Sequence, residues 1–235
     1  AEIRDRILKD PPNRQISPAL AEVVTLQVTL APEAPAGDRE LRIGTANGLS
    51  NPLRFCVGQL AEFSKPPAQS PNPDLDRFLA RLGRPPMRPT NQVEFRVTLP
   101  TVVNGQILPG AVDRFRFHAR QGQPLVISVR ARDLIPYLAD AVPGWFQATL
   151  ALFDAAGKEV AYADDFRFHP DPVLHVEVPH DGEYVLEIKD AIYRGREDFV
   201  YRLSMGERPF ITAHFPLGGP AGKETLVELQ GWNLP

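Results

Sequence analysis

The sequence predicts an all-β protein built around a β-sandwich, and three observations support that prediction. The 235 residues include 25 prolines, about twice the usual share of about 5%, and proline is poorly tolerated inside helices. Between residues 92 and 206, runs of alternating apolar and polar residues recur, with turn signals about every 8–12 residues. The stretch 145–165 holds one complete hairpin of this kind, in which two alternating runs flank the turn Asp154–Gly157.

The central region, 92–206, contains about eight or nine such runs, enough for a sandwich of two sheets. Phe146 and Tyr162 fall in the inward phase of the hairpin and are expected in the core. No segment in this region is left for crossover helices, so a parallel sheet is not expected. The turns expected between the runs include Asn104-Gly105, Pro109-Gly110, Gln121-Gly122 and His180–Gly182.

The regions on either side contain too few strands for complete domains. Within 1–58 we expect strands at 23–30, 40–45 and 53–57, with a turn at Asn47-Gly48. Residues 207–235 contain two further strands around a glycine-rich turn and look like the opening of another domain. Strands 207–235 are therefore candidates to complete 20–58, because pairing would cover edges that otherwise invite aggregation.

A proline-rich linker is expected over 59–91. Within it, 74–82 predicts one short helix, since Asp74 can cap it and the apolar residues recur with helical spacing.

Composition and charge narrow the function classes. A net charge of −3 argues against a nucleic-acid partner, which requires clustered cations. No run of 18 apolar residues is present, so membrane insertion is not expected, and no signal peptide is recognised. Cys56 stands alone between apolar neighbours and is expected to be a buried, inert thiol.

Several motifs of the central region resemble the bacterial pre-peptidase C-terminal domain and cover about 93–205 in that family's order. The resemblance implies a jelly-roll-like β-sandwich that serves as a non-catalytic accessory module of a secreted, periplasmic or cell-surface protein; collagen-binding modules of clostridial collagenases belong to the same family. The motifs are Asn104–Ile107, Val112–Phe117, Gly122–Ile127, Leu152–Asp165 and Asp181–Leu186.

The flanks resemble IPT/TIG immunoglobulin-like domains. Pro209–Gly222 and Val227–Leu234 are similar to the first two strands of such a domain, and Ala34–Ile43 and Gly48–Val57 to its last strands. The alternation of the two domain types is similar to that in large exported proteins of the planctomycete type.

Calcium is the one cofactor that the sequence suggests, because Ca²⁺ takes six to eight oxygen ligands from carboxylates and carbonyls on loops. The resemblance implies a site built from an acidic segment before the first strand and from aspartates ahead of the Asp-x-Phe strand. This chain keeps Asp113 in the second of these elements, but it has Ala111 where an acidic residue is common, and its leading segment 88–93 has no carboxylate. A second acidic group is the pair Asp164 and Asp165, with Asp154, Asp171 and Asp140 expected nearby. For each of these aspartates, capping of a turn is the alternative role.

Aromatic residues in two long loops suggest a binding surface. Loops 132–145 and 163–173 are rich in proline, aspartate and aromatics, and long loops on a rigid scaffold are where ligands usually bind. The candidate ligand-binding residues are Tyr137, Trp145, Phe166 and Phe168, although Trp145 can equally close one end of the sandwich.

Catalytic motifs are missing from the sequence. It has no G-x-S-x-G elbow, no HExxH and no CxxC, so an enzyme is not expected. The leading prediction is a non-catalytic accessory or spacer module. The alternative is a carbohydrate- or protein-binding module, collagen-binding-like, that targets a linked hydrolase to an extracellular polysaccharide or protein.

Overall fold

The structure is a computed structural model, and its described residues form two compact units. One unit consists of 36–65 together with 93–235; of the other, 1–35 with 66–92, the structure describes 24–35 and Pro66. The helix expected at 74–82 lies outside the described residues. No helix in the described part of the chain is long and apolar enough to cross a bilayer. The described residues are 24–66, 94–108, 110–134, 146–195 and 198–235.

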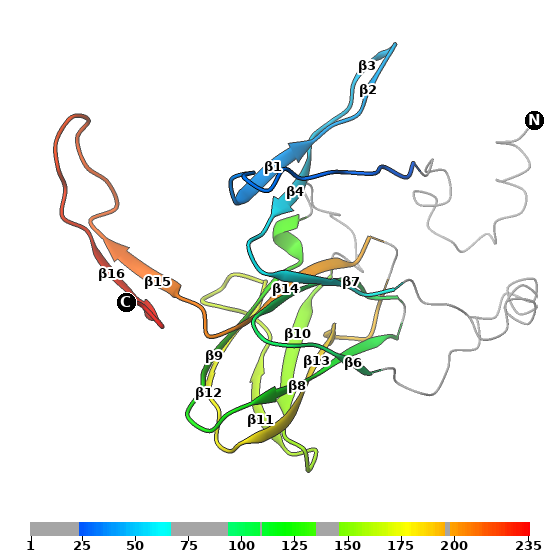
Figure 1. Cartoon of the computed structure of the whole chain (residues 1–235), viewed down its shortest axis with the longest axis vertical. Coiled ribbons are helices and arrows are strands. Elements are labelled where there is room, and N and C mark those ends of the chain that lie inside the picture. The colour runs from blue at the N-terminus through cyan, green and yellow to red at the C-terminus, as the bar shows by residue number, and fades with distance from the viewer. Residues whose placement is uncertain (1–23, 67–93, 109, 135–145, 196–197) are drawn as a thin grey trace, which may run out of the picture. The chain divides into compact units, whose positions relative to one another are not determined.

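Two five-stranded sheets form the centre of the first unit (Figure 1). The first has the order β11 (Glu159–Ala163), β10 (Ala148–Phe153), β13 (Gly182–Asp190), β8 (Val112–Ala119), β6 (Glu94–Arg96). The second has the order β12 (Val173–Glu177), β9 (Pro124–Arg130), β14 (Val200–Gly206), β7 (Thr101–Gln106), β5 (Ala61–Ser64). The strands are antiparallel to their neighbours, except for the edge strands β5 and β6, each of which is parallel to its partner.

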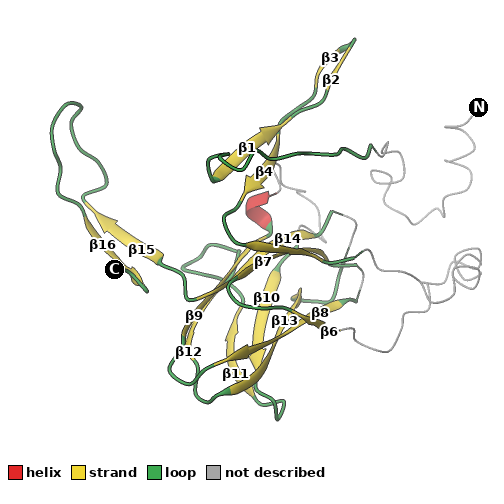
Figure 2. Cartoon of the chain, viewed as in Figure 1, coloured by secondary structure: helices red, strands yellow, loops and turns green. Residues whose placement is uncertain are grey.

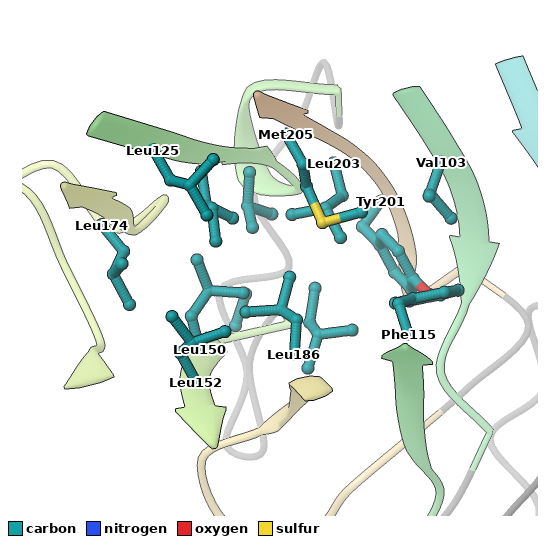
Figure 3. Close-up of a cluster of buried hydrophobic side chains, with 14 of the residues drawn as sticks. Val103, Phe115, Leu125, Leu150, Leu152, Leu174, Leu186, Tyr201, Leu203 and Met205 are labelled. Carbon is teal, nitrogen blue, oxygen red and sulfur yellow. The ribbon is translucent and has the colours of Figure 1, made fainter. Parts of the chain in front are cut away.

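The sheets enclose one hydrophobic core, and this confirms the predicted all-β sandwich. In β8 the inward Phe115, Phe117 and Ala119 alternate with the outward Arg114, Arg116 and His118. Side chains from both sheets meet between the layers (Figure 3). The labelled residues from the two sheets include Phe115, Leu150, Leu152 and Leu186 from the first and Val103, Leu125, Leu174, Tyr201, Leu203 and Met205 from the second.

Tyr162 does not join this core, although its sequence phase predicted that it would. The pairing of β10 with β11 shifts register at Leu152/Phe153, and Tyr162 is 51% exposed. A bulge at this point changes which face each following side chain occupies. Phe146, in contrast, is buried as predicted.

Two further predictions in this region are wrong. The linker expected from residue 59 contains β5, which pairs in parallel with β7 from Ala61↔Thr101 to Ser64↔Asn104. Asn104-Gly105 is not a turn but lies inside β7. A Cβ on Gly105 would collide with the ring of Tyr201, so the ring lies directly over this glycine. The glycine therefore marks a close side-chain approach rather than a chain reversal.

The N-terminal flank is a two-stranded ribbon of β1 (Gly37–Leu41) and β4 (Leu53–Val57), extended by the short pair β2 (Gly44–Thr45) and β3 (Gly48–Leu49) (Figure 2). The strand at 53–57 is as predicted, whereas the turn lies at 46–47, one residue before the predicted Asn47-Gly48, because Gly48 begins β3. Residues 24–30 form no strand, although their apolar positions alternate, and Val24 is 61% exposed. Alternation alone does not make a strand without a hydrogen-bonding neighbour.

The C-terminal flank is a hairpin of β15 (Phe210–Phe215) and β16 (Glu228–Trp232). These two strands pair with each other, and β1 pairs with β4, so the described strands of the two flanks belong to separate sheets. Completion of 20–58 by 207–235 stays a prediction, as does the immunoglobulin-like character of the flanks.

Candidate functional site

The described residues at the ends of the two predicted aromatic loops lie at the end of the sandwich where β9 and β13 finish. Asp171, which is 3% exposed, is fixed just before β12. Its carboxylate accepts hydrogen bonds from the backbone N–H groups of Ala131, Arg132 and Asp133, at 2.8–3.0 Å. Ala131 directly precedes the short 3₁₀ helix η1 (Arg132–Leu134), and the other two donors lie in this helix. Asp171 therefore fixes the start of loop 132–145.

Asp190 fixes the other end of the same loop. This carboxylate is completely buried and accepts a hydrogen bond from the backbone N–H of Gln147 at 3.1 Å. It also accepts from the backbone N–H groups of Ile192 and Arg194 and from the Arg194 guanidinium. Burial acts to raise the pKa of Asp190, but the bonds from Arg194 and the backbone outweigh it and hold the pKa below its ordinary value.

The structure describes two of the four predicted ligand-binding aromatics, and these two differ in how far they are exposed. Tyr137 and Trp145 lie outside the described residues. Phe168 is fully exposed and has a positive φ of 68°. Phe166 is half-buried because its ring packs against Phe210 and Trp232, with centroid distances of 5.6 and 5.8 Å.

Phe166 thus belongs to an aromatic cluster that joins the C-terminal hairpin to the sandwich. Trp232 lies parallel to the His175 ring of β12 at 4.7 Å, with an interplanar angle of 3°. Phe210 stacks on Trp232 at 5.5 Å. Arg167 donates a hydrogen bond to the carbonyl oxygen of Thr212 at 2.7 Å. Part of loop 163–173 therefore packs against a neighbouring element, and Phe168 is the predicted aromatic in the described part of that loop that faces solvent.

This cluster predicts that Trp232→Ala will detach the hairpin. Aromatic pairs contribute about 0.5–1.5 kcal/mol each beyond the area that they bury, and a lone two-stranded hairpin is marginal in water. Amide hydrogen exchange should accelerate across 210–232 and stay unchanged in β8 and β13. Phe215→Ala is the matched control, because Phe215 lies on the same hairpin and is 75% exposed. Equal acceleration in both variants would contradict the proposed role of the cluster.

The predicted calcium ligands lie in separate environments. Asp154 accepts hydrogen bonds from the backbone N–H groups of Ala156 and Lys158, both at 2.9 Å, which is the turn-capping role. Asp164 and Asp165 are exposed. Within the described ranges, no three His, Cys, Asp or Glu side chains gather as a metal site. Calcium binding stays a prediction.

Asp113 lies in a buried network that sequence reasoning missed. Its carboxylate contacts the ammonium of Lys65 and accepts a hydrogen bond from the Tyr201 hydroxyl at 2.8 Å. The ammonium also donates to the Gln106 carbonyl oxygen at 3.0 Å. Burial raises the pKa of Asp113, with Lys65 and Tyr201 acting against it. The network joins β8 of one sheet to β7 and β14 of the other.

A second ionic network fixes the N-terminal ribbon to the sandwich. Arg130 of β9 donates to both carboxylate oxygens of Asp38, at 2.9 and 2.8 Å, and to Asp133 at 2.7 Å. Arg54 reaches the same two carboxylates at 3.4 and 2.7 Å. The hydrogen bond from Arg130 holds the pKa of Asp38 well below its usual range. Cys56 is half-buried beside Arg130, and burial raises the pKa of its thiol.

Comparison with known proteins gives partial similarities. No family model matches the chain. A segment of 83 residues is 35% identical to a probable subtilase-type serine protease of Deinococcus radiodurans; it makes up 35% of this chain and 10% of the protease. The chain therefore spans only a small part of that curated relative.

Two solved structures resemble parts of the chain. The pre-peptidase C-terminal domain of a collagenase from Bacillus anthracis is 17% identical, with a TM-score of 0.37, and the match covers 50% of this chain and 99% of that domain. A periplasmic inhibitor of g-type lysozyme from Aeromonas hydrophila is 13% identical, with a TM-score of 0.31, and the match covers 48% of this chain and 98% of the inhibitor.

Proposed function

We propose that this chain is a non-catalytic accessory module of a larger exported protein, in which it spaces and orients a hydrolase domain. The main support is the 35% identity to a segment that makes up 10% of a subtilase-type protease, as expected of a module appended to an enzyme. The geometry agrees with a spacer, because both flanking ribbons are fixed to the sandwich. The ion pairs around Arg130 hold one of them and the rings around Trp232 hold the other.

A fusion experiment tests this role. The chain is joined to a subtilase-type protease domain, and kcat/KM is measured on a soluble chromogenic peptide with and without the module. We expect no change in kcat/KM, because a spacer does not contact the reacting atoms. A large change in kcat, or hydrolysis of the peptide by the isolated chain, would contradict the proposal.

One observation favours a targeting role as the second candidate. Phe168 is a fully exposed aromatic side chain on a loop whose neighbour Phe166 is fixed by packing. Such a ring can stack on a sugar or on a proline-rich strand. Under this alternative, retention of the chain on insoluble polysaccharide or collagen should fall in Phe168→Ala. It should persist in Phe215→Ala, which removes an exposed ring elsewhere.

A further inference from the structure

The buried pair of Lys65 and Asp113 brings an amine and a carboxyl group into contact inside the sandwich. The Lys65 backbone N–H donates to the Asn104 carbonyl oxygen at 2.9 Å, which continues the pairing of β5 with β7. Asp113 lies in β8, opposite Ile188 of β13. The two side chains are 11% and 5% exposed. The backbone of each sheet therefore fixes one member of the pair, and water has little access to either.

The surroundings of the pair are largely apolar. Phe63 precedes Lys65 by two positions, and residues at this spacing lie on the same face of a strand. In the same way, Phe115 follows Asp113 by two positions. The rings of Phe63, Phe95 and Phe115 pack together, with centroid distances of 5.6–6.3 Å. Separated charges are costly in such a medium, so transfer of a proton from the ammonium to the carboxylate is easier here than in water.

The hydrogen bonds around the pair would also suit an amide between the two side chains. The lysine nitrogen donates to the Gln106 carbonyl oxygen at 3.0 Å. The Oδ2 atom of Asp113 accepts from the Tyr201 hydroxyl at 2.8 Å, and Oδ1 contacts the ammonium. An amide formed by loss of Oδ1 keeps one N–H for Gln106 and one oxygen for Tyr201. Its formation removes two buried charges and retains both hydrogen bonds.

We propose that Lys65 and Asp113 condense slowly into an intramolecular isopeptide bond. A bond forms between Nζ of Lys65 and Cγ of Asp113, and the bond from Cγ to Oδ1 breaks. The ammonium gives up two of its three protons, both to Oδ1, which leaves as water, and the third stays on the amide nitrogen. The Tyr201 hydroxyl stabilises the negative charge that develops on Oδ2 during the addition. Ammonium and carboxylate thus become amide and water.

The fixed contact between the two groups makes this reaction feasible. An amine and a carboxylate do not condense in dilute solution, but two groups held in reactive geometry behave as if each were present at about 10⁵–10⁸ M. The groups meet only after β5 and β8 have joined their sheets, so the step follows folding. Freshly folded protein therefore holds the ion pair, and the condensed form accumulates with time.

The isopeptide bond connects the two layers of the sandwich covalently, because β5 and β8 belong to different sheets. It also closes the loop 65–113. A cross-link that closes a long loop restricts the unfolded chain and so raises stability. This modification goes beyond the accessory role and does not depend on it.

Mass spectrometry of the intact chain tests the proposal, with denatured samples taken after purification and after several days at pH 7.5. We expect a species lighter by one water molecule, in a fraction that grows with incubation. Wild-type chain kept unfolded in guanidinium chloride should retain its full mass, because its two groups are no longer held together. Digestion with trypsin should give a branched peptide that joins 55–77 to 97–114, since trypsin does not cleave at Lys65-Pro66.

Two variants locate the reaction. Lys65→Arg keeps the positive charge but cannot form the amide, because its guanidinium stays protonated, so it should retain its full mass. Tyr201→Phe keeps the ring and should lose water at least about tenfold more slowly, because Oδ2 then lacks its donor. An unchanged rate would overturn the role of the hydroxyl.

Three results would overturn the isopeptide bond itself. These are a full mass of the folded wild type after incubation, an equal loss of water in Lys65→Arg, or a branched peptide that joins other segments. Each of them would leave the accessory role intact, because the fusion experiment tests that role separately.

Discussion

Lys65→Met is expected to destabilise the protein by about 3–5 kcal/mol, the usual result of removing one partner from a buried ion pair. The Lys65 side chain is 11% exposed and that of Asp113 is 5% exposed, so the remaining carboxylate would have little access to water. It would keep one hydrogen bond, from the Tyr201 hydroxyl. Urea unfolding at pH 7.5 measures the loss.

Two controls separate the charge effect from the loss of side-chain volume. Lys158→Met removes an exposed lysine and should change stability by less than about 0.5 kcal/mol. The double variant Lys65→Met with Asp113→Asn should recover most of the loss, because the amide is uncharged and can still accept from Tyr201. If the double variant is no more stable than Lys65→Met, the buried charge is not the cause.

The loss in Lys65→Met should also shrink as the pH falls. Burial raises the pKa of the Asp113 carboxyl, and Lys65 opposes that rise, so the pKa is expected to be higher still in the variant. Between that raised pKa and the ordinary carboxyl pKa, the folded variant binds more protons than the unfolded chain, and acidification therefore stabilises it. The difference in the free energy of unfolding between Lys65→Met and the wild type should therefore be smaller at pH 5 than at pH 7.5.

Asp190→Ala is expected to lower the free energy of unfolding by a similar amount, about 3–5 kcal/mol. This fully buried carboxylate accepts from three backbone N–H groups and from the Arg194 guanidinium, so alanine removes the acceptor of all of them at once. Hydrogen exchange at Gln147 and Ala148 should accelerate, because Asp190 fixes that end of loop 132–145. Thermal unfolding measures the overall loss.

Asp190→Asn is the matched variant, since it keeps the shape and removes the charge. We expect Asp190→Asn to lower the free energy of unfolding by about 1–3 kcal/mol. The folded pKa of Asp190 lies below its ordinary value, so its contribution is fully present above the ordinary pKa and is lost as the pH falls through the folded pKa. Wild type and Asp190→Asn should therefore converge in strong acid. A constant difference down to pH 2 would contradict this assignment.

The sequence predicted most of the fold, because the period of two is a local signal. The inward Phe115 and Phe117 of β8 could be recognised from their neighbours alone. The errors arose where distant residues determine the local structure. Gly105 has a turn signature, but the Tyr201 ring covers it, and the bulge at Leu152/Phe153 places Tyr162 on the exposed face.

The candidate sites were less predictable for the same reason. Lys65 stands in a proline-rich region, 48 positions before its partner Asp113, and no local pattern connects the two. Phe166 was predicted as a ligand-binding residue, but its ring packs against the rings of Phe210 and Trp232, which follow much later in the chain. Apolar and polar residues alternate along 61–64, as they do in the strands of the sandwich. This alternation was the one local signal that could have placed β5 in the sheet.

The strand order also has a consequence for the timing of folding. β13 joins β10 to β8 in the first sheet, and β14 joins β9 to β7 in the second. These central strands are the last two of the sandwich to be synthesised, since they cover 182–190 and 200–206. Until they emerge, each sheet can exist only as separate pairs of strands, so we expect the core to close late, after nearly the whole sandwich has left the ribosome. Such non-local pairing is associated with slow folding.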